Sequence, residues 1–312
     1  MTATPHFTVR PWADGDDLRL LEILGDPENP QHHQDRAMLR PDADQPWTRC
    51  LVAEDQGVPV GAAVVYSTAI HPQRLWFYAE TAPAERRRGI ATLLLRHLRE
   101  AIQQAPAGIP DQLKARYAEP AEHTAGFLTA AGFSPLQRSR QVVIGPGALT
   151  VPELAEDGLT LDELATGSVE LTTAVREFYL ATHDWDPAEI SIGRTNQLLL
   201  GETSGASGAV VLRERPKTQG GRILAFAISY TSERTEDPTD VLLGHHPDTE
   251  PAQAQFALAG LLGMLTAQYP VRLEIDDSMT PLLPIVEGLM GTGHAEVEMT
   301  TRILATDAHP SR

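Results

Sequence analysis

The chain has 312 residues, 42% of them hydrophobic, and a single cysteine, Cys50. This length suits two domains of about 150 residues each, and one cysteine excludes an internal disulfide and fits a reducing cytoplasm. The net charge of −17 argues against nucleic-acid and anionic-membrane partners. No segment has the apolar length of a membrane span or the layout of a signal peptide.

The first half predicts an alternation of strands and helices. Residues 6–12 read as a strand, and a helix over 14–24 begins with aspartates that complement its dipole. Residues 26–47, rich in Pro, Asp and His, predict an irregular, partly helical excursion. The elements expected next are strands at 48–54, 60–67 and 74–81, a helix at 90–105, a strand at 113–119, a helix at 121–133 and a strand at 136–144.

The second half repeats this plan more loosely. Residues 145–158 combine Gly, Pro and acidic residues without periodicity, so we expect an interdomain linker at 146–158. The elements expected after it are a helix at 169–182, strands at 208–215, 221–232 and 239–246, a helix at 252–268, a strand at 271–276, a helix at 279–290 and a strand at 295–305. We therefore predict an α+β fold with domains at 1–145 and 159–312, each with a mostly antiparallel sheet.

The acidic charge is concentrated in the second half. Residues 1–150 carry a net charge of −2 and residues 151–312 a net charge of −15. A surface of one sign raises the local concentration of the opposite sign, which favours a cationic partner. The other interpretation is that the acidic surface only keeps the protein soluble.

The stretch AERRRGIATLLLRHL, Ala84 to Leu98, places three arginines and a glycine directly before an apolar helix. A helix N-terminus has unpaired N–H groups and a partial positive charge, so it attracts anions. Glycine lets the backbone approach a ligand closely, and arginines supply bidentate donors for phosphate oxygens. The pattern predicts a diphosphate site, although it is neither a Walker loop nor a Rossmann fingerprint.

The run Arg86-x-x-Gly89-x-Ala91 resembles the (Q/R)-x-x-G-x-(G/A) pyrophosphate loop of the GNAT acyl-CoA-dependent N-acetyltransferases. The resemblance covers about residues 5–145 and includes FLTAAGF, which is similar to the closing helix and GF ending of that family. It implies two GNAT-like domains, each with a twisted sheet flanked by helices and a splay between central strands. It also implies acetyl-CoA as the acyl donor and CoA as a product.

The same resemblance implies where the acyl donor binds. The pantetheine arm is expected along the backbone of the strand before the loop, and the pyrophosphate on the backbone amides that follow, with the arginine side chains nearby. The implied residues are Ala79, Glu80, Thr81, Arg86, Arg87, Arg88, Gly89, Ile90, Ala91 and Thr92.

The proton-transfer groups of the family are missing at the matching positions. The tyrosine that often serves as general acid falls on Leu128, and a common asparagine falls on Ala121. Glu80 and Glu119 are the carboxylates that could replace the missing base, and His123 is a further candidate. A residue of the second half or a water relay are other possibilities, or the site binds acyl-CoA without turnover. The positions of the usual bases hold Gln73, Leu75 and Phe77.

The matching loop of the second half, DTEPAQAQ, lacks the features of a diphosphate site. Glu250 stands at the arginine position, and Gln253 and Gln255 replace small residues. A carboxylate there repels a diphosphate, so the chain resembles a tandem GNAT protein whose domain at 159–312 is degenerate. Such a chain is expected as a monomer with internal pseudo-dimer pairing or as a homodimer.

The expected function is that of a cytoplasmic N-acetyltransferase. It moves an acetyl group from acetyl-CoA to a primary amine of a small, cationic molecule, held between residues 26–47 and the acidic second half. The alternative is a non-catalytic acyl-CoA-binding sensor or scaffold, because the expected acid and base are missing. The adjacent pairs His32-His33 and His245-His246 lack metal-ligand spacing, so we expect no metal site.

Overall fold

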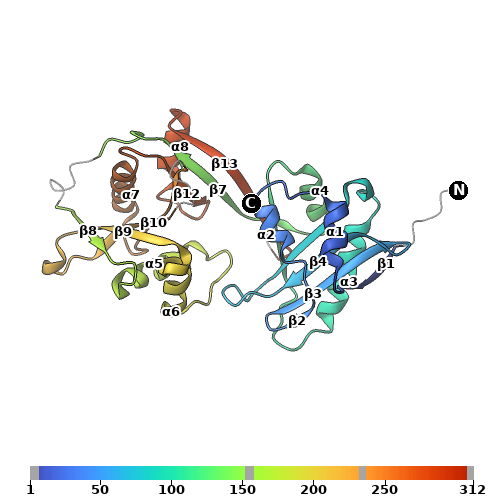
Figure 1. The fold of residues 1–312 in the computed structure, drawn as a ribbon. Helices are drawn as coiled ribbons and strands as arrows, with labels where there is room; N and C mark the ends of the chain where they lie inside the picture. The colour runs from blue at the N-terminus through green and yellow to red at the C-terminus, as the bar shows by residue number, and fades with distance from the viewer. Residues whose placement is uncertain (1–6, 152–157, 232–236, 308–312) are drawn as a thin grey trace. The chain divides into compact units, whose positions relative to one another are not determined.

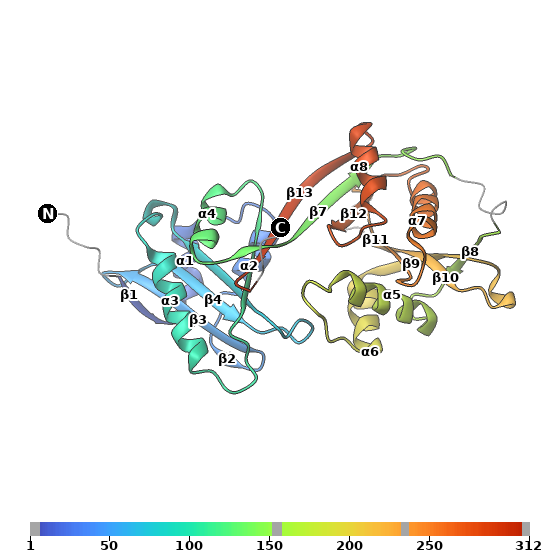
Figure 2. The same ribbon diagram turned by 180° about the vertical axis from the view of Figure 1, so that it is seen from behind.

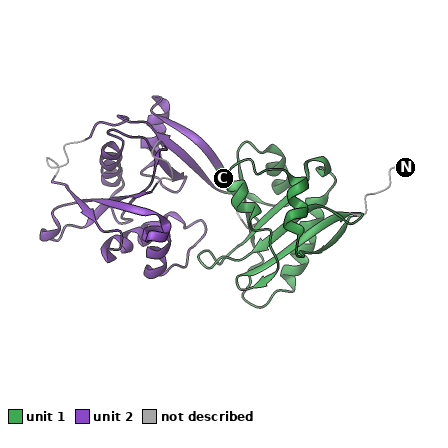
Figure 3. Cartoon of the chain, in the orientation of Figure 1, with its two compact units in different colours: residues 1–136, 301–312 green, residues 137–300 purple. Residues whose placement is uncertain are grey.

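The computed structural model describes residues 7–151, 158–231 and 237–307. They form two compact units, shown in separate colours in Figure 3: unit 1 contains Met1–Leu136 and Thr301–Arg312, and unit 2 contains Gln137–Thr300. The prediction of an α+β fold with mostly antiparallel pairing is confirmed. The segment expected as a linker falls within unit 2, and its residues 152–157 lie outside the described residues.

Unit 1 is a sheet with helices on both faces (Figure 1). Its elements are β1 (Thr8–Pro11), α1 (Asp16–Leu24), α2 (Pro30–Arg36), β2 (Ala43–Asp44), β3 (Trp47–Asp55), β4 (Val58–Tyr66), β5 (Leu75–Thr81), α3 (Ile90–Gln103), β6 (Leu113–Ala118), α4 (Glu122–Ala130) and the end of β13 (Ala295–Ala305). The strand order is β1-β3-β4-β5-β6-β13, with β2 paired to β3.

Strand β4 shows why this sheet has a core on each face. Successive side chains of a strand point to opposite faces, and β4 is almost continuously apolar. Ala63 and Val65 pack into the core that contains residues of α3 and α4. Ala62 and Val64 pack into a second core with Leu20 of α1. Burial on both faces fixes the register of β4 at the centre of the unit.

The parallel strands β5 and β6 separate soon after they begin. Only Leu75 pairs with Leu113, and Trp76 with Lys114. Beyond these pairs β5 stays hydrogen-bonded to β4 on its other side, and β6 stays hydrogen-bonded to β13. The result is the splay between central strands that the family resemblance implied.

The last strand of unit 1 comes from the other end of the sequence. Residues 301–305 of β13 pair with residues 114–118 of β6, and Leu304 is buried in the core beside α3 and α4. Strand β7 (Ser134–Ile144), which the sequence assigned to the first domain, instead pairs with β12 (Val271–Asp276) in unit 2. The compact units therefore differ from the predicted domains at 1–145 and 159–312, because the two halves exchange their final strands.

Unit 2 has a similar order of elements. Besides β7 and β12 they are β8 (Thr160–Leu164), α5 (Val169–Thr182), α6 (Ile192–Thr195), β9 (Ala206–Arg213), β10 (Ile223–Tyr230), β11 (Thr239–His245), α7 (Pro251–Leu265) and α8 (Leu283–Gly291). Helix α7 packs on β10 and β11 (Figure 2). Strands β11 and β12 are parallel over three residue pairs that begin with Thr239 and Val271. Within the described ranges, no helix has both the length and the apolarity needed to cross a bilayer.

Candidate active site

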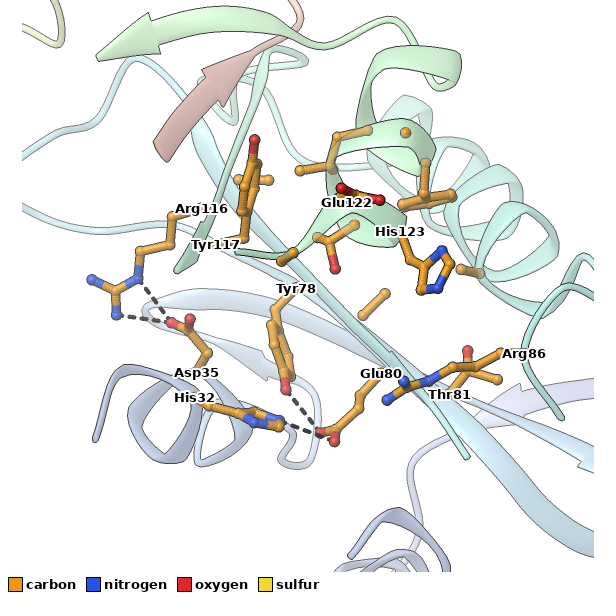
Figure 4. Close-up of a pocket in the computed structure, with 18 of the residues that line it drawn as sticks. His32, Asp35, Tyr78, Glu80, Thr81, Arg86, Arg116, Tyr117, Glu122 and His123 are labelled. Atoms are coloured by element: carbon orange, nitrogen blue, oxygen red, sulfur yellow. Dashed lines mark hydrogen bonds and ion pairs between the residues drawn. The ribbon is translucent and has the colours of Figure 1, made fainter. Parts of the chain in front are cut away.

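A pocket of about 1190 Å³ opens at the splay of unit 1. Its walls come from β5 and β6 beyond their last pair, the start of α3, the helix α4, and α2 with the residues before it (Figure 4). Every residue of the implied acyl-donor set lines this pocket except Arg88. The structure thus brings the arginine–glycine loop and part of the 26–47 excursion to one cavity.

The loop before α3 makes a tight left-handed turn. Arg87 has a φ of 67° and Gly89 a φ of 83°. Left-handed backbone is uncommon for a residue with a side chain and is often found at ligand sites. Gly89 is the N-cap of α3, and no side chain caps the helix there. The first N–H groups of α3 are therefore available to an external anion.

The three arginines of the loop have different surroundings. The Arg88 guanidinium pairs with Asp55 at 3.3 Å and with Glu85, so its charge is already compensated. Arg86 and Arg87 are exposed, line the pocket, and have no ion-pair partner among the described residues. These two side chains are the cations that the loop offers to a ligand, and Arg88 contributes through its backbone.

Gly61 of β4 lets the start of α3 approach the sheet. A Cβ at this position would lie 2.9 Å from the backbone oxygen of Glu80 and 3.1 Å from Cγ2 of Ile90. Contacts this short are not tolerated without a shift of the β5 backbone. The glycine therefore sets the spacing between β4 and the junction that carries the loop.

Glu80 is 8% exposed and sits at the centre of a hydrogen-bond network (Figure 4). Oε1 accepts from Arg36 Nη2 at 2.5 Å and from His32 Nε2 at 3.0 Å. Oε2 accepts from Arg36 Nε at 2.9 Å and from the Tyr78 hydroxyl at 2.8 Å. A carboxylate has about four lone-pair sites, so these four donors leave none for another proton.

The network also decides the charge of Glu80. Burial on its own raises the pKa of Glu80, but hydrogen bonds from Arg36 and Tyr78 outweigh that effect and hold the pKa below its ordinary value. The carboxylate is therefore a stable anion and a weak proton acceptor. This geometry favours a positioning role for Glu80 over the role of general base.

Both ring nitrogens of His32 make hydrogen bonds. Nδ1 accepts the backbone N–H of Glu28 at 3.1 Å, so the ring proton lies on Nε2 and is donated to Glu80. The imidazole is neutral in this arrangement and fixed in one tautomer. It serves as a wall of the pocket and a link between α2 and β5.

The second candidate base, Glu119, lies beyond the pocket. Its carboxylate accepts from Arg302 Nε at 2.7 Å, and it is absent from the lining residues. The contacts give Glu119 no access to an amine inside the pocket.

Helix α2 is held at both edges of the splay. On the β5 side it is anchored by Arg36 to Glu80, and on the β6 side Asp35 accepts two hydrogen bonds from Arg116 at 2.8 and 2.9 Å. Gln31 also accepts from Thr301 of β13 at 2.5 Å. These contacts fix α2 across the opening between the strands.

The sequence prediction missed the partners of Glu80. Two periodicities could have found them: His32 and Arg36 are four residues apart on one helix, and Tyr78 and Glu80 are two residues apart on one strand. What the sequence does not contain is the pairing between these two elements. That pairing depends on the tertiary packing of α2 against β5.

The head of α4 carries other polar groups of the pocket. Ala121 and Leu128, the positions of the missing asparagine and tyrosine, both line the pocket, and Leu128 is 2% exposed. Glu122 and His123 also line it, and Figure 4 shows the His123 ring pointing toward Arg86. The described residues contain no cluster of three or more His, Cys, Asp or Glu side chains that could hold a metal.

The start of α7 in unit 2 differs from the start of α3. Glu250 is the N-cap of α7, and its carboxylate accepts the N–H groups of Ala252 at 2.9 Å and Gln253 at 3.1 Å. Pro251 occupies the first helical position, where no N–H is available. The anion-binding end of this helix is thus already occupied by its own side chain.

Comparison with known proteins agrees with this geometry. Residues 46–135, which lie in unit 1, match the family model for the acetyltransferase (GNAT) domain. No curated protein matches the chain.

Solved structures show the same fold over both units. A GCN5-related N-acetyltransferase from Sphaerobacter thermophilus is 17% identical, with a TM-score of 0.63 over 96% of this chain and 95% of that one. A tandem GNAT protein from the clavulanic acid biosynthesis pathway, solved without AcCoA, is 16% identical, with a TM-score of 0.57 over 98% of this chain and 100% of that one. The chain therefore has the fold of tandem GNAT proteins.

Proposed function

We propose that this chain is an N-acetyltransferase that moves an acetyl group from acetyl-CoA to a primary amine of a small, cationic molecule. The observation that carries the proposal is the continuity of one pocket in unit 1. It runs from the uncapped start of α3, with the free cations Arg86 and Arg87, to the opening between β5 and β6. Acetyl-CoA has a diphosphate, which suits the cationic start of α3, and a thioester at its other end, which would lie at the opening between β5 and β6.

The loop supplies the groups that hold the diphosphate. N–H groups from Arg87 to Thr92 offer several donors in a small space, and the helix dipole favours negative charge there. Arg86 and Arg87 add two cations that are not compensated by carboxylates of the described residues. Binding through backbone groups makes the site depend on the turn at Gly89 more than on particular side chains.

The free edge of β5 suits the extended arm of the donor. Beyond Trp76, the strand keeps β4 on one side and separates from β6 on the other. Backbone groups of residues 77–81 on the open side have no partner strand in the described fold, so an amide-containing chain can pair with them. A strand N–H near Thr81 is then placed to stabilise negative charge on the thioester oxygen.

The acceptor end of the pocket favours a cation. Arg116 is paired with Asp35, and Arg36 is paired with Glu80, so the positive charge of each arginine is compensated by a carboxylate. Glu28, which also lines the pocket, has no basic partner among the described residues. The balance at α2 is therefore negative, which favours a cationic acceptor.

One feature favours the alternative of a non-catalytic acyl-CoA binder. Glu80 has no free lone pair, Glu119 is ion-paired outside the pocket, and Leu128 has no acidic proton. A sensor needs the donor site but no proton transfer. Amine acetylation still remains possible without a strong base, because an amine of ordinary basicity is partly neutral at alkaline pH and can release its proton to water.

A screen of amines for acetyl-CoA-dependent release of free thiol tests the proposal. We expect turnover with a small amine that carries a second positive charge, and weaker turnover with a neutral or anionic amine of similar size. Thiol release with no amine in the panel, despite measurable acetyl-CoA binding, would instead support the sensor.

A further inference from the structure

The network around helix α2 contains two buried carboxylates that differ in how many hydrogen bonds they accept. Glu80 of β5 accepts four, two on each oxygen. Asp35 of α2 is 6% exposed and accepts two, both from Arg116 and both on Oδ1. Its other oxygen, Oδ2, accepts no hydrogen bond from the described residues. A carboxylate oxygen this deep in a protein is costly without a donor, so a ligand or a water is expected to supply one.

Asp35 lines the proposed donor and acceptor pocket, far from the arginine–glycine loop. Figure 4 shows Asp35 and Arg116 at one end of the cavity, and Arg86 and His123 at the other. Oδ2 of Asp35 is not among the fully enclosed atoms that lack a partner, so it can be reached from the cavity. It is therefore available in the part of the pocket that is left for the acceptor when a diphosphate is bound at the start of α3.

The electrostatics of the two carboxylates follow from this difference. Burial raises the pKa of Asp35 above its ordinary value, and the charge and hydrogen bonds of Arg116 do not offset it. At Glu80 burial acts in the same direction, but hydrogen bonds from Arg36 and Tyr78 outweigh it. The charged form of Asp35 is thus less well stabilised than that of Glu80, and a second cation at Oδ2 would correct this.

The carboxylate of Asp35 is held in place before any ligand arrives. Two nitrogens of the Arg116 guanidinium bind it from β6. Gln31, four residues earlier and on the same side of α2, accepts from Thr301 of β13. These contacts fix both ends of α2 against neighbouring strands. A fixed carboxylate loses little freedom when it binds a cation, which favours affinity.

We propose that Asp35 binds the second positive charge of the acceptor through Oδ2 and thereby selects diamines over monoamines. The inference rests on the proposed acetyl transfer and names the residue behind its preference for dications. The ammonium at Asp35 stays protonated, and the amine at the other end of the molecule is the one that reacts. Asp35 takes no proton in this scheme. An acceptor with a methyl group in place of the second ammonium makes no charge-assisted hydrogen bond there.

A calorimetric titration of the CoA-saturated protein with diaminobutane measures this contact without turnover. We expect Asp35→Asn to raise the Kd for diaminobutane about tenfold or more, the effect of losing a hydrogen bond between charged groups. The matched control is Asp17→Asn, at an exposed aspartate of α1 that does not line the pocket. It removes the same charge and should leave the Kd unchanged. Equal Kd values in the two variants would overturn the proposal.

A second variant separates direct contact from an effect of Arg116. Asp35→Asn leaves Arg116 without its carboxylate, and an uncompensated arginine repels cations by itself. Asp35→Asn with Arg116→Gln removes both charges, and we expect it to bind diaminobutane as weakly as the single variant. Recovery of wild-type affinity in the double variant would contradict a direct contact. The Kd for acetyl-CoA, expected within about twofold of wild type in every variant, checks that unit 1 is folded.

The last readout is kcat/KM for acetyl transfer to diaminobutane and to butylamine, two acceptors with the same carbon chain. The wild-type protein should prefer diaminobutane, and Asp35→Asn should reduce this preference about tenfold or more by lowering kcat/KM for the diamine alone. A wild-type protein without the preference, or a variant that keeps it, would overturn the proposal. If the wild-type protein acetylates neither amine, the proposed function fails, and the calorimetric titration still decides whether Asp35 binds the dication.

Discussion

The N-termini of α3 and α7 occupy matching places in the two units, but only the N-terminus of α3 is open to an external anion. Each helix follows a strand that is parallel to its neighbour for only a few residues. At α3 the cap is Gly89, with no side-chain acceptor for the first N–H groups. At α7 the cap is Glu250, whose carboxylate accepts two of those groups. A helix dipole alone thus does not make an anion site, because the residue at the cap decides whether an external anion can reach it.

Donor binding is proposed for unit 1, and the largest expected effect comes from removing the exchanged strand β13. A chain that ends after Thr300 loses the strand that covers β6, including buried Ile303 and Leu304. Burial of two such side chains contributes about 3–6 kcal/mol. We expect unit 1 to unfold at a much lower denaturant concentration and acetyl-CoA binding to be lost. A chain that ends after Asp307 keeps these contacts and should behave as the full chain does. Donor binding retained by the chain that ends after Thr300 would contradict this account of β13.

The next prediction reverses the charge of the loop. Arg86→Glu with Arg87→Glu puts two carboxylates where the diphosphate is proposed to bind. We expect the Kd for acetyl-CoA to rise by about 100-fold or more, since each charge-assisted hydrogen bond contributes about 1.5–3 kcal/mol before screening.

The matched control is Arg96→Glu with Arg194→Glu, at two exposed arginines that do not line the pocket. It changes the net charge of the protein by the same amount. Equal loss of affinity in the two double variants would mean that long-range charge, and not the loop, governs binding.

Two buried carboxylates give the units opposite responses to pH. Burial, followed by repulsion from Glu274, raises the pKa of Asp276 in unit 2 to about 7. A raised folded pKa contributes stability that is complete below the unfolded value of about 4, and this stability is lost as pH rises through about 7. The pKa of Glu80 in unit 1 is lowered, so its contribution is present above about 4 and is lost in acid.

Chemical denaturation of Asp276→Asn between pH 5 and 8 checks this difference. The substitution keeps the shape of the side chain but removes its titration. We expect the wild-type unit 2 to lose stability across this range and the variant to lose less. A parallel loss in both proteins would show that another group is responsible.

The smallest effect is expected from removing the N-cap of α7. Glu250→Ala frees two N–H groups and should lower the stability of unit 2 by about 0.5–2 kcal/mol, the usual cost of losing an N-cap. It should not create a second donor site, because Pro251 and the missing arginines remain. A second equivalent of bound acetyl-CoA in this variant would mean that the cap alone closes the site.

The features that the sequence predicted correctly are those encoded over a few residues. The apolar spacing of α3, the glycine at its start and Glu250 at the start of α7 are all local, and the splay followed from the family resemblance. The exchange of β7 and β13 was not predictable in this way. Both strands mix polar and apolar residues and become apolar at their C-terminal ends, so the local sequence does not identify the partner strand of either.

The same limit applies to the site. Glu80 is identifiable in the sequence as a carboxylate beside the loop, but its role depends on Arg36 and His32, which are 44 and 48 residues away. Contacts between elements far apart in the sequence therefore decide which polar side chains are hydrogen-bonded within the protein and which are available to a ligand.

The central claim is that the chain has one open donor site, at the start of α3. A calorimetric titration of the full chain with acetyl-CoA tests it most directly. We predict one equivalent per chain, abolished by Arg86→Glu with Arg87→Glu and retained in Glu250→Ala. Two equivalents in the wild-type protein, or one equivalent that survives the double arginine variant at unchanged affinity, would contradict the account.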